Sequence, residues 1–273
     1  MTIHKDTFIR KLIGTVATTS SLVTIYSFFI KSASSPIKES VLFLVILLVL
    51  NVLIALLLSK EKSSISIKVN NTTKLSVHFG DIGNSENIVV PVNDYFDTLV
   101  NDEVVSKDSI HGKLIKNEFG GNEKLLASLI DKALEGKPSE TIDERKIERN
   151  KRYELGTVAK ISHDGKDFYL VALTKFDDDN KASIDSSEYQ IVISKLLNFI
   201  GTHSQGKKVS FPLLGGSARS GITTLTKQQK LELLILSMTL SDKLNVDEGL
   251  ELVLSEGDKK ELSLNALLQK NLR

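Results

Sequence analysis

The chain has 273 residues, a net charge of +1 and 41% hydrophobic residues, values typical of an ordinary globular protein. It contains no cysteine, which excludes disulfides, thiol catalysis and thiolate metal sites. These averages hide an uneven distribution, because much of the apolar content is concentrated in the first fifty-nine residues. The start of the chain therefore differs in character from the rest.

Two apolar runs lie at residues 12–30 and 41–58, and each is about as long as a helix that crosses roughly 30 Å of hydrocarbon. Only a short polar turn, residues 31–40 with Pro36, separates them. We therefore expect a two-span transmembrane hairpin at residues 1–59, with both ends on one side of the bilayer. A cleaved signal peptide is the alternative for the first run, but no small-residue cleavage site is evident and a second apolar run follows at once.

Basic residues predict the orientation of this hairpin. More of them lie before the first run and after the second run than in the turn between the runs. The first group is Lys5, Arg10, Lys11, Lys60 and Lys62, and the turn has Lys31 and Lys38. The positive-inside rule then favours both termini in the cytoplasm, in a multi-pass membrane protein that contacts lipid.

The two runs differ in chemistry. The first is rich in Gly, Ser and Thr, whereas the second is almost entirely Leu, Val and Ile with one amide, Asn51. Small and hydroxylated residues allow close helix packing in lipid, so the first run resembles a packing helix and the second a lipid-facing one. Asn51 either bonds within the hairpin or marks an interface for self-association into a homo-oligomer.

A short linker at residues 60–64 leads to a polar part, residues 65–273, in which strands and helices alternate. The first elements are a hairpin of strands at 65–69 and 74–79, a strand at 88–90, a helix at 122–134 and a charged loop or exposed helix at 135–152. Further elements are strands at 156–161 and 168–173 around an Asp164-Gly165 turn, a helix at 188–201, a strand at 208–211, a helix at 226–244, a strand at 250–254 and a helix from residue 262. This order predicts an α/β sheet covered on both faces.

Three loops after predicted strands have unusual composition. They contain Gly80-Asp81-Ile82, the segment from Pro91 to Asn93, and a glycine-rich stretch at 212–221. Ligands of open α/β sheets collect at such loops, and glycines allow backbone N–H groups to surround a diphosphate. A Gly-Gly-Ser sequence can equally be an ordinary turn.

In this order, the three loops resemble those of the macro domain, a module that binds ADP-ribose, over about residues 65–271. The chain is most similar to the macro domains of Thoeris antiphage systems. It shares with them the stretches at 92–98, 109–112, 153–157 and 169–176. The resemblance implies a three-layer α/β/α domain with a mixed sheet, and a TIR-domain enzyme as the functional partner that produces the signal. No nucleic-acid partner is expected.

The resemblance also implies a ligand site. Asp81 would accept a hydrogen bond from the adenine amino group, Ile82 would flank the adenine, and Asn93 would lie near the distal ribose. The full set of expected ligand residues is Asp81, Ile82, Asn93, Asp94, Asp97, His111, Gly112, Leu214, Gly215, Gly216, Ser217, Ala218, Arg219, Ser220 and Gly221.

One loop departs from the macro pattern. ADP-ribose hydrolases of this type have a second asparagine and several glycines after the first asparagine, where this chain has Asp94-Tyr95-Phe96-Asp97. We therefore expect binding without catalysis, with no catalytic residue and no cofactor. The acidic pair could complement a positive group on the distal ribose of an ADP-ribose derivative, such as the ammonium of a conjugated amino acid.

Several of these residues have a structural alternative. Asp81 could form a turn or cap a helix, Asp94 and Asp97 could lie on the surface, and His111 could be a structural histidine. His78, His163 and His203 lack partners at metal-ligand spacing, so no metal site is expected.

The function that we expect is that of a membrane effector whose macro domain binds an ADP-ribose-derived signal, with membrane disruption and abortive infection as the outcome. Two alternatives stay open. The chain could be a membrane-tethered ADP-ribosyl hydrolase, or a passive tether for ADP-ribosylated partners.

Overall fold

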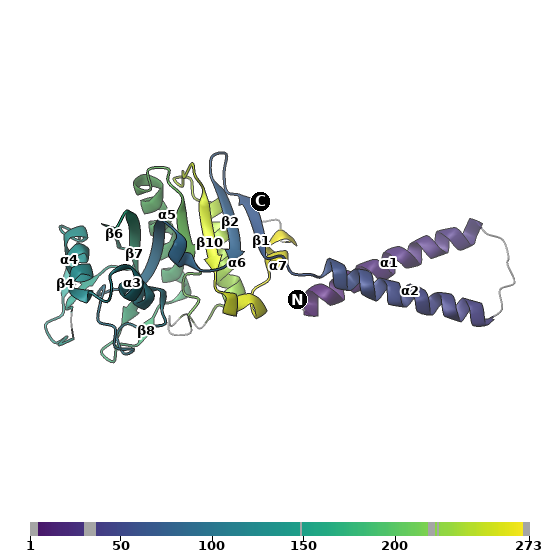
Figure 1. The fold of residues 1–273 in the computed structure, drawn as a ribbon, viewed down its shortest axis with the longest axis horizontal. Helices are drawn as coiled ribbons and strands as arrows, with labels where there is room; N and C mark the ends of the chain where they lie inside the picture. Colours follow the sequence, from purple (N-terminus) through teal and green to yellow (C-terminus); the bar gives the residue numbers. More distant parts are fainter. Residues whose placement is uncertain (1–4, 30–36, 148, 218–221, 223, 270–273) are drawn as a thin grey trace. The chain divides into compact units, whose positions relative to one another are not determined.

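The structure, a computed structural model, describes residues 5–29, 37–147, 149–217, 222 and 224–269. It divides the chain into two compact units (Figure 1). The first contains residues 1–63 and 263–270, and the second contains residues 64–262. The sequence predicted a hairpin at 1–59, a linker at 60–64 and a domain at 65–273. In the structure, the linker and the C-terminal helix fall in the same unit as the N-terminal helices.

The first unit is built on two long helices, α1 (Lys5–Phe29) and α2 (Ile37–Leu58). They lie against each other near Asn51, whose side chain is buried. The Thr19 hydroxyl donates to Asn51 Oδ1 at 3.2 Å, and Asn51 Nδ2 donates to the Leu47 carbonyl at 2.9 Å. The amide is therefore used within the hairpin, as one of the two sequence interpretations expected. The predicted turn at 31–40 lies largely outside the described residues.

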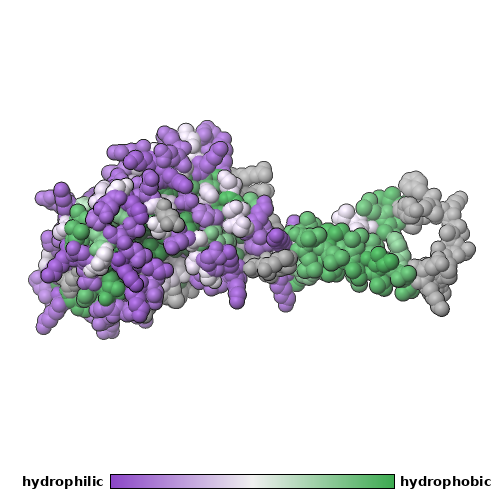
Figure 2. Space-filling view, viewed as in Figure 1, coloured by the Kyte–Doolittle hydropathy of each residue, from purple (hydrophilic) through white to green (hydrophobic). Residues whose placement is uncertain are grey.

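Within the described residues, one helix is long and apolar enough to cross a membrane, and it is α2, over Val41–Leu58. Its large aliphatic side chains are mostly exposed, and Figure 2 shows a mostly hydrophobic surface over α1 and α2. The second expected span therefore has structural support. The first span, in α1, stays a prediction.

The C-terminal helix, α7 (Leu264–Gln269), is bonded to the linker that precedes the second unit. The Glu61 carboxylate accepts from the Asn265 backbone N–H at 2.7 Å and from the Ser263 hydroxyl at 3.1 Å. Asn265 Nδ2 in turn donates to the Lys60 carbonyl at 3.0 Å. The linker is thus fixed to the end of the chain.

The second unit contains a mixed sheet in the order β1-β2-β10-β9-β3-β7-β6, with β8 paired to β7. Its strands are β1 (Ser64–Lys68), β2 (Lys74–Phe79), β3 (Asn87–Asn93), β6 (Val158–His163), β7 (Lys166–Phe176), β8 (Ala182–Ser183), β9 (Val209–Pro212) and β10 (Leu250–Leu254). Five neighbouring strands run parallel, namely β2, β10, β9, β3 and β7. The strands at the two edges, β1 and β6, are antiparallel to their neighbours. Five carboxyl ends therefore meet at one edge.

Helices cover both faces of this sheet. They are α3 (Ile110–Glu118), α4 (Glu123–Ala133), α5 (Ser186–His203) and α6 (Lys227–Thr239). Phe168 and Leu170 of β7 share a core with residues of α3 and α4. Because side chains alternate along a strand, Tyr169 points to the other face, where its ring contacts Phe199 of α5. This arrangement gives the expected three layers with a mixed sheet.

Most predicted elements are present, because their sequence signals are local. Thr226 and Gln229 form the capping box that starts α6, and Asp164-Gly165 forms the turn between β6 and β7 with positive φ at both residues. The helix expected at 226–244 is shorter at its end. Short 3-10 helices lie at Ile82–Asn84 (η1) and Glu256–Lys260 (η3).

The charged stretch at 135–152 differs from its expectation. It forms a small antiparallel ribbon of β4 (Ser139–Thr141) and β5 (Lys151–Tyr153), and it carries arginines that pack inward. The interpretation as a solvated loop or exposed helix is wrong for Arg145, whose side chain is 8% exposed.

Candidate functional site

The expected ligand loops follow three parallel strands and lie along one edge of the sheet. Asp81 follows β2, the glycine-rich loop follows β9, and Asn93 ends β3. The sheet order places β10 between β2 and β9, and β9 beside β3. With about 4.8 Å between strands, the edge from β2 to β3 is about 14 Å long. The order along this edge is therefore Asp81, glycine loop, Asn93.

Asp81 caps the short helix η1. Its Oδ1 accepts a hydrogen bond from the Gly83 backbone N–H at 3.0 Å, and the side chain is exposed. Ile82 is half-buried and packs against the main core. The capping role that the sequence left open for Asp81 is thus present in the structure, and the exposed carboxylate still faces solvent.

The glycine-rich loop begins with a tight turn. Gly215 has φ of +66°, a conformation that favours glycine, and the Gly216 N–H donates to the Leu213 carbonyl at 3.0 Å. A Cβ at Gly216 would lie 3.0 Å from that same oxygen. Ser217 is exposed. The remaining expected ligand residues of this loop, Ala218, Arg219, Ser220 and Gly221, lie outside the described residues.

Two buried side chains hold this loop from below. The Tyr189 hydroxyl of α5 donates to the Leu214 carbonyl at 2.8 Å. The Lys230 ammonium of α6 donates to the carbonyls of Gly215 at 2.8 Å and Ile222 at 3.0 Å. Both side chains are almost fully buried. Helices on the sheet face thereby fix where the loop leaves β9 and where it returns.

Asn93 organises the loop that follows β3. Its Oδ1 accepts from the backbone N–H groups of Tyr95 and Asp97, and its Nδ2 donates to Asp97 Oδ2 at 2.9 Å. Asp97 is completely buried and binds the Arg145 guanidinium through both oxygens, at 2.9 and 2.7 Å. The negative charge of Asp97 is therefore balanced within the protein.

Asp94 is also buried. Its Oδ1 accepts from the Phe176 N–H at 3.1 Å, and its Oδ2 lies 3.3 Å from Arg152 Nε. Burial raises the pKa of Asp94 to about 6, although the Phe176 N–H and Arg152 oppose the shift. The fold therefore favours the protonated form of Asp94 more than water does.

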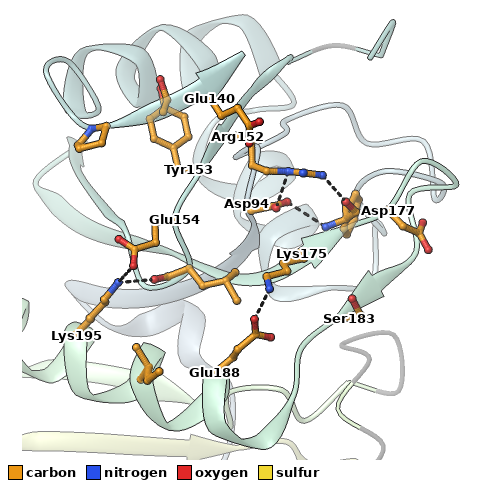
Figure 3. Close-up of a pocket in the computed structure, with 15 residues that line it drawn as sticks. Asp94, Glu140, Arg152, Tyr153, Glu154, Lys175, Asp177, Ser183, Glu188 and Lys195 are labelled. Carbon is orange, nitrogen blue, oxygen red and sulfur yellow. Dashed lines mark hydrogen bonds and ion pairs between the residues drawn. The ribbon is translucent and has the colours of Figure 1, made fainter. Parts of the chain in front are cut away.

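A cavity of about 820 Å³ opens beside Asp94, at the carboxyl end of β7 (Figure 3). Its polar lining pairs internally: Lys175 binds Glu188, Lys195 lies 2.6 Å from Glu154, and Arg152 binds Asp94. Because β7 lies next to β3, this cavity continues the ligand edge beyond Asn93. It is large enough for a small polar group.

His111 and Gly112 start α3. A Cβ at Gly112 would lie 2.2 Å from the Ser106 carbonyl oxygen, so close packing explains this glycine. His111 is 5% exposed, its Nε2 has no hydrogen-bond partner in the described part of the chain, and burial lowers its pKa to about 4. The imidazole is therefore neutral at pH 7. Among the residues that the structure describes, no cluster of metal ligands is found.

Sequence reasoning missed Arg145, Arg152, Tyr189 and Lys230. All four act through contacts with residues at least eight positions away, and Arg145 and Asp97 are 48 positions apart. Of these four residues, only Lys230 has a signal in the sequence. It lies on the same face of α6 as the apolar residues Leu231, Leu234 and Met238, and it is buried with them.

The amino-acid sequence of this chain is similar to those of known proteins. A family model described as the macro domain of Thoeris protein ThsA matches residues 75–255. Thoeris protein ThsA of Bacillus amyloliquefaciens (strain Y2) is 34% identical over 140 residues, which is 50% of this chain and 43% of that protein. The chain thus spans less than half the length of this curated relative.

Solved structures of macrodomains are also similar. The Oceanobacillus iheyensis macrodomain with ADP gives a TM-score of 0.49 at 12% identity, over 77% of this chain and 96% of that one. Thermosipho africanus DarTG in complex with ADP-ribose gives 0.40 at 16% identity, over 71% and 44%.

The parallel strand ends, the loop after β9 and the asparagine that ends β3 agree with the expected macro domain. Since the family model covers most of the domain, the chain belongs to the ThsA macro domain family.

Proposed function

We propose that this chain is a membrane-anchored sensor of a Thoeris-type antiphage system, which binds an ADP-ribose-derived signal produced by a TIR-domain enzyme. The observation that carries the proposal is the order Asp81, glycine loop, Asn93 along one edge of the sheet. This order matches that of an adenine, a diphosphate and a distal ribose in an extended ADP-ribose.

The proposed pose assigns a set of residues to each part of the ligand. The exposed Asp81 carboxylate accepts from adenine, and half-buried Ile82 offers an apolar contact beside it. The diphosphate lies on the glycine loop, and the distal ribose lies toward Asn93. His111, whose Nε2 is buried and has no hydrogen-bond partner among the described residues, lies on α3, which packs against β3.

The cavity beside Asp94 accommodates a substituent on the distal ribose, so the ligand is an ADP-ribose derivative, and an amino-acid conjugate is one candidate. Arg152 and Lys175 at the cavity suit a carboxylate, while Asp94 and Glu188 suit an ammonium group. Asp97 does not take part, because it is not among the residues that line this cavity and Arg145 balances its charge.

We further propose that the ligand is bound and not hydrolysed. Asn93 is held by three hydrogen bonds within its own loop, and Asp94 and Asp97 are each paired with an arginine. No group in this described loop is positioned as an unencumbered general base. A membrane-tethered hydrolase stays the second candidate.

The membrane part of the proposal rests on α2, with α1 as its packing partner in a two-span hairpin. Ligand binding would change the assembly of hairpins and disrupt the membrane. To convert a resting to an active population from 1:99 to 99:1, the ligand must favour the active state by about 5.5 kcal/mol.

Two measurements test this function. The full chain, purified in detergent from cells that also express the TIR partner, should carry a bound nucleotide derivative in native mass spectrometry. Cells that express both proteins should lose membrane potential, as measured with a potential-sensitive dye, and a chain without residues 1–59 should not cause this loss. Depolarisation by the truncated chain would favour the passive-tether alternative, in which residues 1–59 only anchor the protein.

A further inference from the structure

A groove of about 710 Å³ lies along the helix pair of the first unit. Its lining residues on α1 are adjacent pairs at positions 10–11, 14–15 and 18–19, and Ile54 and Leu58 of α2 form the other wall. Residues four positions apart lie on the same face of a helix. The groove is therefore one face of α1 closed on its side by the last turns of α2. Its volume falls within the roughly 300–1,000 Å³ that is typical of ligand sites.

One end of the groove is basic. Arg10 and Lys11 lie at this end together with Leu58, because α1 and α2 run in opposite directions (Figure 1). No carboxylate is among the described residues that line the groove. Basic pockets between helices at a membrane interface suit the head groups of anionic lipids. This end of the groove therefore favours an anionic group.

The rest of the groove offers an apolar surface, although it carries threonines. The hydroxyl of Thr15 donates to the Leu12 carbonyl at 3.0 Å, and the hydroxyl of Thr18 donates to the Gly14 carbonyl at 2.9 Å. Hydroxyls that bond to the preceding turn of their own helix need no water. Beyond its basic end, the groove is consequently suited to a hydrocarbon chain.

The length of the groove matches one leaflet of a bilayer. From Arg10 to Thr19 it covers nine residue steps of α1, which is about 14 Å at about 1.5 Å per residue. Half of a hydrocarbon core of roughly 30 Å is about 15 Å. Thr19 bonds to Asn51, which lies near the middle of the apolar segment Val41–Leu58. The groove thus runs from one interface to the centre of the hairpin.

A second copy of the hairpin is a poorer occupant of this groove. In a parallel two-fold dimer the same face of each copy meets itself, so Arg10 and Lys11 of both copies would lie together. These like charges repel each other. An anionic lipid brings the opposite charge to the same place.

We propose that this groove binds one anionic phospholipid, with the phosphate at Arg10 and Lys11 and one acyl chain along Gly14 and Thr18. This inference rests on the membrane anchoring in the proposed function and does not involve the ADP-ribose site. Guanidinium and ammonium groups donate charge-assisted hydrogen bonds to phosphate oxygens. The bound lipid contacts both helices, so it stabilises the hairpin in membranes that contain anionic lipid.

The test measures lipid binding to the full chain in detergent by native mass spectrometry. One probe is dioleoylphosphatidylglycerol, which is anionic, and the other is dioleoylphosphatidylcholine, which has the same acyl chains and no net charge. The double variant Arg10→Gln with Lys11→Gln removes the basic end. Gly14→Leu fills the groove, and a Cβ at Gly14 would meet no other heavy atom within 4 Å, so the helix can accept this side chain.

Each of these changes has a matched control. Lys60→Gln with Lys62→Gln removes two exposed positive charges that follow α2 and do not line the groove. Ser20→Leu adds a leucine to α1 at an exposed position outside the groove. The controls separate binding in the groove from general attraction of lipid to a basic and apolar protein.

We expect the wild-type chain to bind phosphatidylglycerol about thirtyfold more tightly than phosphatidylcholine, as two basic side chains near a membrane surface predict. The Arg10 and Lys11 double variant should lose this preference. Gly14→Leu should weaken the binding of both lipids by about tenfold, the effect of losing contact with about two CH₂ groups. Both controls should match the wild type.

Three results would overturn the proposed site. The preference for phosphatidylglycerol could survive in the double variant or be lost equally in the Lys60 and Lys62 control, and either result would leave only general charge attraction. Unchanged lipid binding in Gly14→Leu would place the lipid outside the groove. Wild-type dimers that Gly14→Leu dissociates would assign the groove to a second copy of the chain.

The membrane anchoring itself is tested separately by flotation of the full chain with liposomes of the same two lipids. A wild-type chain that does not float with either kind of liposome would overturn the proposed function. A chain that floats but shows no lipid preference in native mass spectrometry would overturn only the lipid site.

Discussion

The guanidinium of Arg145 binds the carboxylate of Asp97 through two hydrogen bonds of 2.9 and 2.7 Å, and both side chains are buried. The same carboxylate accepts from Asn93, and the Arg145 side chain also lies 3.7 Å from the centre of the Tyr95 ring. The loop that departs from the hydrolase pattern is therefore held by an arginine from the segment that connects β4 and β5. Arg145 also donates to the Arg149 carbonyl, within the same segment.

Arg145→Met should destabilise the domain strongly, because it leaves the Asp97 charge buried and unpaired. We expect a loss of about 3–5 kcal/mol in the free energy of unfolding, measured by urea denaturation. The double variant Arg145→Met with Asp97→Asn should recover part of this loss. Lys107→Met, which breaks an exposed pair with Asp102, should cost under about 1 kcal/mol. If Arg145→Met and Lys107→Met lowered the free energy of unfolding equally, the buried ion pair would contribute no more to stability than the exposed one.

Asp94 should make stability depend on pH. Its pKa is about 6 in the folded protein against 3.8 ordinarily, so the fold favours the protonated form. Its contribution to stability is therefore complete below about pH 4 and is lost as the pH rises through 6. The advantage of Asp94→Asn over the wild type should grow by up to about 3 kcal/mol between pH 4 and 7.

The measurement is denaturation of both proteins across this pH range. Asp178→Asn, at an exposed position in the loop after β7, is the matched control and should follow the wild type. If the difference between Asp94→Asn and the wild type were constant with pH, Asp94 would not titrate as its burial implies.

Gly216→Val should abolish binding of ADP-ribose while leaving the fold intact. A Cβ at this position meets the Leu213 carbonyl oxygen at 3.0 Å, so the turn must move. The loop would then present a bulky side chain where the diphosphate should lie. Gly257→Ala, whose new Cβ would have ordinary contacts at 3.6 Å, should bind normally in calorimetry. Unchanged affinity in folded Gly216→Val would mean that the cleft has been misplaced.

Asn51→Leu should loosen the helical hairpin by about 0.6–2 kcal/mol, because it removes the hydrogen bond from Thr19. Helix proximity can be followed in lipid by a spin-label pair placed on α1 and α2, with Ile46→Leu at an exposed position as control. The affinity of the chain for ADP-ribose should not change. A wild-type distance distribution in Asn51→Leu would show that the amide does not hold the pair together.

The sequence predicts the sheet well because its signals are local. Alternating residues predict β1 and β2, and an Asp-Gly turn predicts β6 and β7. The order of glycine and asparagine loops also predicts which strand ends form the site. The family match supports the macro domain itself, and the choice of strand ends stays a prediction.

Contacts distant in the sequence could not be predicted in this way. Asp97 resembles a surface aspartate until Arg145 is placed beside it, and Glu61 resembles a linker residue until Asn265 is placed at its carboxylate. Lys230 similarly lies in an amphipathic helix, where a lysine ordinarily reaches solvent. These pairings depend on tertiary structure, which a periodic pattern does not encode.

The proposed function requires that the chain binds an ADP-ribose-type ligand without consuming it. The direct test incubates the full chain with a stoichiometric amount of the ligand recovered from cells with the TIR partner, and then separates the products by chromatography. We predict that the ligand is recovered intact after long incubation and that it competes with ADP-ribose for the site. Release of free ADP-ribose or its fragments over repeated turnovers would contradict the claim and make the hydrolase the better account.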